Sequence, residues 1–165
     1  MLSIPKIEQR TEQPYVAIRT TISMNEISTA LPPLIPEVKA WLKKNNITPG
    51  SPPFFQYLRM HDNDQFLTEV GFAVKEPVKG DDRVNAGSFP AGLYATLTYT
   101  GDYMQMKSAH SALDKWVKDN GFKEKLRINA DGSKSGTRTE LYITDPQQEP
   151  DPTKWVTIIS YMVAE

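Results

Sequence analysis

The sequence predicts an α+β fold built from two similar halves. A strand, a helix and two further strands follow one another in the first half, and the same order returns in the second. Two apolar runs, residues 68–77 and 139–146, each hold one glutamate and close with an acidic residue and a proline. A carboxylate in such a run is costly to bury unless another group pairs with it. Glu69 and Glu140 therefore suggest a duplicated module with a ligand pocket between its copies.

Composition narrows the functional class. The chain of 165 residues has 39% hydrophobic residues, which suffices for one domain or two closely packed halves. A net charge of -1 and the lack of a basic run argue against direct binding of nucleic acid. The absence of cysteine excludes disulfides, thiolate metal sites and cysteine nucleophiles. Because neither a signal peptide nor an apolar run of about 18 residues is present, we expect a soluble cytoplasmic protein without a membrane partner.

The first half, about residues 9–78, begins with a predicted strand at 15–22, which is rich in β-branched and aromatic residues. Ser23 and Glu26 have the spacing of a capping box. Three prolines interrupt the helical stripe that follows, so we expect a broken helix whose regular part covers residues 34–44. The remaining predicted elements are strands at 54–60 and 65–74 and a turn at 61–64 between them.

A polar linker, residues 75–88, is predicted to separate the halves. The second half, about residues 89–163, repeats the order of elements. The helix at 103–120 is predicted to begin at a cap formed by Asp102 with Gln105 and to end at Gly121. The predicted strands of this half lie at 93–100, 138–144 and 155–163.

Several motifs of the second half resemble the GyrI-like family, the effector-binding domains of some multidrug-sensing transcription regulators and their stand-alone relatives. The motifs are residues 89–95, residues 99–103, Trp116 and residues 140–146. The resemblance extends from residue 9 to residue 163 and implies one GyrI-like domain over residues 1–165. It also implies a fold in which two strand-helix-strand-strand modules form a concave antiparallel sheet with helices on the outer side.

Alternation along the strands predicts a binding site. Glu140 shares a face with Arg138 and Tyr142, whereas Leu141 and Ile143 are expected to face the helix. If the halves meet across a groove, Glu140 and Tyr142 can form a carboxylate in an aromatic cage together with Trp155 and Tyr161 on the last strand. Aromatic faces and a carboxylate both attract positive charge, so the expected ligand is a lipophilic, aromatic or cationic small molecule.

The resemblance adds roles for individual residues. It implies that Glu140 contacts the positive charge of the ligand, that Trp155 belongs to the same pocket and that Trp116 occupies another aromatic position of the family. Glu69 enters the predicted site only through the internal repeat. Tyr94 and Tyr103 are candidate ligand contacts or residues at the edge of the core.

Structural alternatives stay open at this stage. Glu140 can form an ion pair with Arg138 or Arg19, and Trp116 can be a plain core residue. His61 in the predicted turn and His110 on the helix are interpreted as solvated or core residues, because no partner has the spacing of metal ligands. No metal and no cofactor are expected.

Three functions remain possible from the sequence. The first is a stand-alone domain that binds small molecules for drug sensing, sequestration or detoxification. The second is a hydrolase of electrophilic, cyclopropane-bearing genotoxins, as the resemblance implies, with Glu140 as general base. The third, also implied by the resemblance, is a protein-interaction factor whose partner is gyrase or a regulator. Since only about 14 residues precede the first predicted strand, we expect no fused DNA-reading helices and no direct binding of DNA.

Overall fold

The computed structural model describes residues 1–60 and 64–164. The chain forms two compact units. The N-terminal unit comprises Thr11–Ala91, and the C-terminal unit combines Met1–Arg10 with Gly92–Glu165. Each unit packs helices against an antiparallel sheet, so the predicted α+β class is confirmed. No helix in the described ranges is long and apolar enough to cross a membrane.

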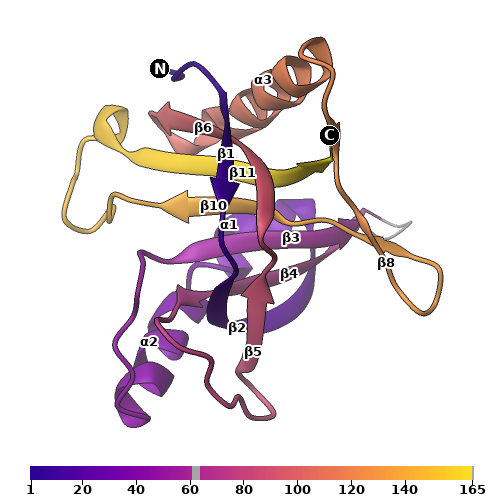
Figure 1. The fold of residues 1–165 in the computed structure, drawn as a ribbon. Helices are drawn as coiled ribbons and strands as arrows, with labels where there is room; N and C mark the ends of the chain where they lie inside the picture. Colours follow the sequence, from indigo (N-terminus) through magenta and orange to yellow (C-terminus); the bar gives the residue numbers. More distant parts are fainter. Residues whose placement is uncertain (61–63, 165) are drawn as a thin grey trace. The chain divides into compact units, whose positions relative to one another are not determined.

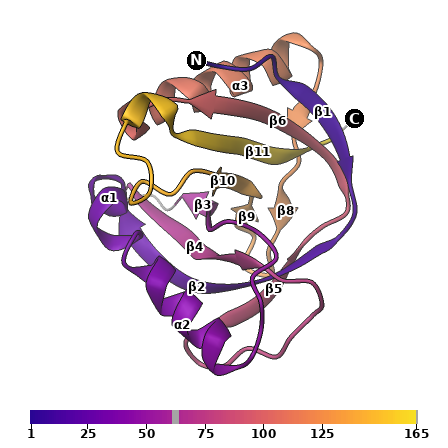
Figure 2. The same ribbon diagram turned by 90° about the vertical axis from the view of Figure 1, so that its left-hand side faces the viewer.

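The sheet of the N-terminal unit has the order β3-β4-β2-β5, and every neighbouring pair is antiparallel (Figure 1). Its strands are β2 (Gln13–Ser23), β3 (Phe54–Met60), β4 (Gln65–Ala73) and β5 (Asn85–Phe89), and its helices are η1 (Met24–Glu26), α1 (Ile27–Ala30) and α2 (Leu34–Lys44). Val38 and Leu42 of α2 pack on one face of this sheet, against a cluster that includes Ile18 and Phe72. Figure 2 shows α2 lying along that face.

The sheet of the C-terminal unit has the order β1-β6-β11-β10, with β7 paired to the end of β11. The strands are β1 (Lys6–Arg10), β6 (Gly92–Thr100), β7 (Lys123–Glu124), β10 (Arg138–Tyr142) and β11 (Val156–Ala164); β8 (Arg127–Ile128) and β9 (Lys134–Ser135) form a separate hairpin. The helices are η2 (Tyr103–Gln105), α3 (Met106–Asp119) and η3 (Pro152–Lys154). Leu113 of α3 packs over Leu97 and Ile159, and Figure 2 shows α3 along β6 and β11.

The predicted duplication is present in the topology, but the two glutamates are not equivalent. Each unit contains a strand, a helix and two strands, and the order β3-β4-β2 corresponds to β10-β11-β6. The counterpart of β10 is therefore β3. Glu140 lies on β10 and Glu69 on β4, so the repeated sequence motif does not follow the structural repeat.

The capping and turn residues in the sequence predicted most of the helix boundaries correctly. The capping box of Ser23 and Glu26 is present, and α2 covers the predicted residues. Asp102 caps η2 by accepting a hydrogen bond from the Met104 amide, and Gly121 has a φ of +78° where α3 ends. Residues 61–63 of the predicted turn lie outside the described residues.

Other expectations are wrong. The predicted linker contains β5, and β1 precedes the strand that we expected to be first. The short strands β7, β8 and β9 were not predicted.

Candidate functional site

Glu140 faces α3. In the register of β10 and β11, Glu140 lies opposite Ile159, which belongs to the core beneath α3. Because residues directly opposite one another in a sheet share a face, Glu140 points to the helix side. The expectation that Leu141 and Ile143 occupy that side is wrong, since Leu141 pairs with Ile158 on the other face and Ile143 is largely exposed.

His110 and Tyr142 both bind the Glu140 carboxylate. The Nε2 atom of His110 on α3 lies 2.6 Å from Glu140 Oε2, and the Tyr142 hydroxyl donates to Oε1. Glu140 is only 5% exposed, so these bonds replace water around its charge. Two arginines were considered above as ion-pair partners of Glu140. In the structure, Arg138 binds Asp114 and Glu124, and Arg19 binds Glu69 in the N-terminal unit.

An aromatic cluster adjoins this carboxylate. Tyr103 makes an edge contact with Tyr142 at 5.5 Å between ring centroids and a tilted contact with Trp155 at 4.6 Å. The indole nitrogen of Trp155 donates to the Glu149 carbonyl at 2.7 Å, which fixes the ring. All three rings are half-buried. Four of the predicted site residues, Glu140, Tyr142, Tyr103 and Trp155, are thus brought together in one unit.

Sequence reasoning missed His110 as a member of this site. A signal was present, because His110 follows Met106 by four positions and precedes Leu113 by three, both of which are buried. That spacing places His110 on the buried stripe of α3 rather than in solvent. A half-buried histidine beside a buried carboxylate is a candidate functional pair.

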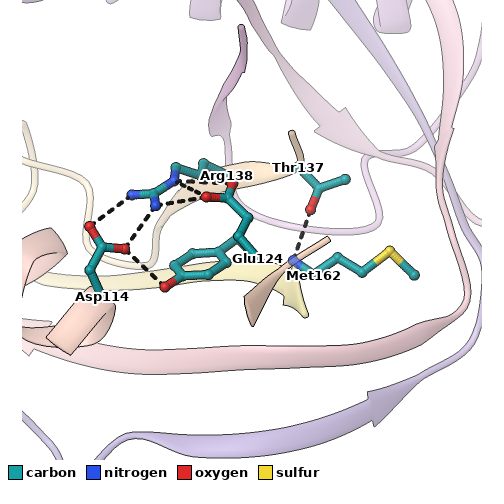
Figure 3. Close-up of polar contacts among 6 residues, drawn as sticks. Asp114, Glu124, Thr137, Arg138 and Met162 are labelled. Carbon is teal, nitrogen blue, oxygen red and sulfur yellow. Dashed lines mark hydrogen bonds and ion pairs between the residues drawn. The ribbon is translucent and has the colours of Figure 1, made fainter. Parts of the chain in front are cut away.

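Tyr161 belongs to a neighbouring ionic network. Its hydroxyl donates to Asp114 Oδ1 at 2.9 Å, and the Arg138 guanidinium lies 4.5 Å from its ring centroid. Arg138 also bonds Asp114 and Glu124 at 2.8 Å each (Figure 3). Burial opposes the charge of Arg138, but the hydrogen bonds from Arg138 to both carboxylates outweigh it and raise the pKa of the guanidinium. Through these contacts Tyr161 on β11 is linked to α3 and to β10.

Trp116 and Tyr94 lie apart from the aromatic cluster in the C-terminal unit. Trp116 is a partly buried residue of α3 that packs against the core. Tyr94 lies on the opposite face of the sheet, since it alternates with Ala95 of the core, and the Arg10 guanidinium sits 4.9 Å from its ring centroid.

Glu69 has a set of partners within the N-terminal unit. Its Oε1 accepts hydrogen bonds from the Tyr15 hydroxyl at 2.6 Å and from Gln56 at 2.9 Å. The Arg19 guanidinium binds Oε2 at 3.2 Å. Burial, together with the Glu69 charge, raises the pKa of Tyr15 above its ordinary value. Glu69 is 1% exposed, and this hydrogen bonding is what a structural carboxylate requires.

Tyr103 provides a pH test of the aromatic cluster. Burial, followed by the charges of Asp145 and Glu140, raises the pKa of Tyr103 to about 12. Because the folded state binds this proton more tightly than the unfolded state, its stabilising contribution is complete below about pH 10 and is lost towards about pH 12. Absorbance titration of the phenolate should therefore show one high-pKa tyrosine fewer in Tyr103→Phe than in the wild type. Titration of the missing group near pH 10 would contradict the buried placement.

The chain was compared with protein families and with solved structures, and both comparisons found similar proteins. The sequence profile described as the GyrI-like small molecule binding domain matches residues 4–163. The C-terminal domain of EcmrR is similar in structure, with a TM-score of 0.76, 20% identity and coverage of 98% of each chain. In the complex of EcmrR with DNA, this chain corresponds to 57% of the EcmrR chain. No curated protein sequence matches significantly.

Two more distant structures share the fold. One is SAV2435 bound to tetraphenylphosphonium, with a TM-score of 0.61, 8% identity and coverage of 98% of this chain and 94% of SAV2435. The other is a hydrolase from Listeria innocua, with a TM-score of 0.60, 14% identity and coverage of 97% and 91%. At such identities the likeness concerns the fold alone. The match of the family profile across nearly the whole sequence is the finding that decides the family: the chain belongs to the GyrI-like small molecule binding domains.

Proposed function

We propose that this domain binds lipophilic aromatic cations beside Glu140 in the C-terminal unit. The observation that carries the proposal is a buried carboxylate next to three half-buried aromatic rings, those of Tyr103, Tyr142 and Trp155. The family supports a small-molecule ligand. The structure of SAV2435 with tetraphenylphosphonium supports the choice of a lipophilic cation as probe.

The physical chemistry of the cluster favours positive charge without demanding one shape. A cation over an aromatic face gains about 2 kcal/mol when the contact is desolvated. A buried carboxylate adds attraction that water screens poorly. Rings and a single charge impose few directional hydrogen bonds, so ligands of different outline can satisfy them. Such a site suits sensing, sequestration or detoxification of varied compounds.

Replacing Glu140 tests the proposal. Tetraphenylphosphonium should bind the wild type, as measured by calorimetry and by quenching of tryptophan fluorescence. Glu140→Gln keeps the size of the side chain but removes its charge, so affinity should fall at least tenfold, which corresponds to about 1.4 kcal/mol. Glu69→Gln is the matched control, because it removes the other buried carboxylate, whose partners are Arg19, Tyr15 and Gln56.

The affinities of the two variants for tetraphenylphosphonium distinguish the possible sites. Unchanged affinity in Glu140→Gln would refute the proposed site, and a tenfold loss confined to Glu69→Gln would move the ligand to the N-terminal unit. Thermal unfolding of both variants shows whether the fold is retained.

Hydrolysis is a second candidate, favoured by the hydrogen-bonded series His110, Glu140 and Tyr142. A carboxylate oriented in this way can accept a proton from water while the water oxygen bonds to an electrophilic cyclopropane carbon. The ring C–C bond then breaks, its electron pair stays on the second carbon, and that carbon takes up the proton, so that one water is added in total. Incubation with a cyclopropane-bearing electrophile should then yield a product heavier by one water. Glu140→Gln would keep substrate bound and stop turnover, whereas a pure binding protein gives no product in either form. A gyrase or regulator partner stays a prediction from the resemblance.

A further inference from the structure

We propose that the Thr157 hydroxyl is a hydrogen-bonding group of this site and that it determines which cations the site prefers. The inference rests on the proposed function and adds a ligand class to it. That class is the lipophilic cations that also carry a hydroxyl or carbonyl group. The polar group of such a ligand bonds to Thr157, while the aromatic rings contact its apolar part.

The Thr157 hydroxyl is buried without a hydrogen-bond partner. Thr157 is 0% exposed, and within residues 1–60 and 64–164 no group bonds its Oγ1 atom. A buried hydroxyl of this kind costs free energy, because it has lost its hydrogen bonds to water and gained none from the protein. The great majority of buried polar side-chain atoms are satisfied, so this exception requires an explanation.

Thr157 lies on the face of the sheet that carries the aromatic cluster. It pairs with Tyr142 of β10, and residues directly opposite one another share a face. Trp155 precedes Thr157 by two residues in extended backbone, so both side chains point to the same side. Tyr103 contacts the rings of both Tyr142 and Trp155. The unsatisfied hydroxyl therefore lies beside the rings that are proposed to bind the ligand.

The polar neighbours of Thr157 on this face direct their protons elsewhere. Tyr99 lies opposite Thr157 on β6, and its hydroxyl donates to the Asp102 carbonyl at 2.6 Å. The Tyr142 hydroxyl donates to Glu140. Because a phenol has one proton, neither ring donates to Thr157. Valine has nearly the shape of threonine and would pack here without the cost of a buried hydroxyl, so packing alone does not explain this residue.

A ligand can supply the bond that the protein does not. The threonine hydroxyl is both a donor and an acceptor, so it can bond a ligand hydroxyl or carbonyl. A site with such a group prefers the ligand that satisfies it over an analogue without the polar atom. Tetraphenylphosphonium has no hydroxyl or carbonyl and can use only its charge and its rings. It therefore tests the proposed function but not the role of Thr157.

Ethyltriphenylphosphonium and (2-hydroxyethyl)triphenylphosphonium form a matched pair of probes, because they have the same charge and differ by one hydroxyl group. Calorimetry with the full chain measures the Kd of each. The wild type should bind the hydroxyethyl compound about fivefold more tightly than the ethyl compound. The preference should disappear in Thr157→Val, whereas Thr157→Ser keeps the hydroxyl and should retain it.

Thermal unfolding without ligand tests whether the hydroxyl is unsatisfied in the free protein. Thr157→Val should raise the Tm by about 2–4 °C, because it removes the buried polar group and keeps the shape. Thr137→Val is the matched control in the same unit. Thr137 is 3% exposed, but its hydroxyl accepts a hydrogen bond from the Met162 amide at 2.8 Å (Figure 3). The control should therefore have a lower Tm and an unchanged ligand preference.

The results distinguish this inference from the proposed function. Equal Kd values of the two probes for the wild type would overturn the inference and leave cation binding intact. A preference that persists in Thr157→Val would overturn it as well, since the ligand hydroxyl then bonds elsewhere. A Tm that falls in Thr157→Val as it does in Thr137→Val would show that the hydroxyl is already satisfied, with the same consequence. Failure of both probes and of tetraphenylphosphonium to bind overturns the proposed function and this inference together.

Discussion

Arg138→Met should lower the free energy of unfolding by about 2 kcal/mol, because it removes the cation between two partly exposed carboxylates. Arg138 bonds Asp114 on α3 and Glu124 on β7 (Figure 3), and its guanidinium lies over the ring of Tyr161. Methionine preserves much of the apolar stem, so the loss reports on charge rather than on packing. Without the guanidinium, Asp114 and Glu124 would face each other as like charges, with side chains that are 45% and 22% exposed, beside the position of Arg138, which is 28% exposed.

Arg83→Met is the matched control for this experiment, and urea unfolding measures both variants. Arg83 forms an equally close ion pair with Glu37, but its side chain is 59% exposed and that of Glu37 is 44% exposed. Exposed pairs contribute about 0–1 kcal/mol, so the control should lose less than about 1 kcal/mol. Equal losses in the two variants would show that the Arg138 network is no more than a surface pair.

Elements with local signals were predictable from the sequence. Pro32 and Pro33 precede the start of α2, Pro36 is accommodated in its first turn, and the two asparagines after Lys44 set its end, so its bounds agree with the prediction. The strand β3 also has the predicted bounds, because its apolar residues lie between turn-forming segments. In both cases the determining residues lie within or next to the element itself.

Short polar strands were not predictable in this way. Lys6–Arg10 contains one apolar residue, and Asn85–Phe89 has a glycine at its centre. Their strand character comes from partners distant in the sequence, since Lys6 pairs with Thr96 and Asn85 with Ala17. A window of neighbouring residues carries no information about such partners.

The face of Glu140 was predicted wrongly for a specific reason. Polarity was used to separate the core side of β10 from the outer side, which would put Leu141 against the helix. In the structure α3 presents His110 and Asp114 to the sheet, so the polar residues Glu140 and Arg138 lie beneath it. When polar side chains of a helix and of a strand form hydrogen bonds with each other, the pattern of the strand alone does not reveal that its polar face is the buried one.

The site was predictable in its residue types rather than in its arrangement. Glu140, Tyr142, Trp155 and Tyr103 were selected as carboxylate and aromatic residues, and they do lie together. Tyr161 was selected on the same grounds, yet its hydroxyl serves Asp114. Glu140 lies opposite His110 of α3, whereas Tyr161 lies opposite Asp114. Which side chain of α3 meets each strand residue is set by how the helix packs, and the strand sequence does not contain that information.

Gly71→Ala should destabilise the N-terminal unit by at least about 3 kcal/mol and is the largest effect expected from a single methyl group. A Cβ at Gly71 would lie 1.9 Å from the Val16 carbonyl oxygen and 2.8 Å from Ala17 Cα. Both atoms belong to the backbone of β2, so no side-chain rotation can relieve the contact. Glycine is needed here because two backbones approach closely, and β2 and β4 would have to separate.

Gly50→Ala is the control, since its added Cβ would come no closer than 3.3 Å to a neighbouring atom, the Ala73 carbonyl oxygen. Its loss in urea unfolding should stay near 1 kcal/mol or less. The comparison also tests the register of β2 with β4, in which Gly71 lies opposite Ala17 and Glu69 lies opposite Arg19. If Gly71→Ala is as stable as the control, that register is wrong, and with it the pairing that gives Glu69 a structural role. A large loss supports the register, in which Glu69 lies opposite Arg19 and its carboxylate binds the Arg19 guanidinium.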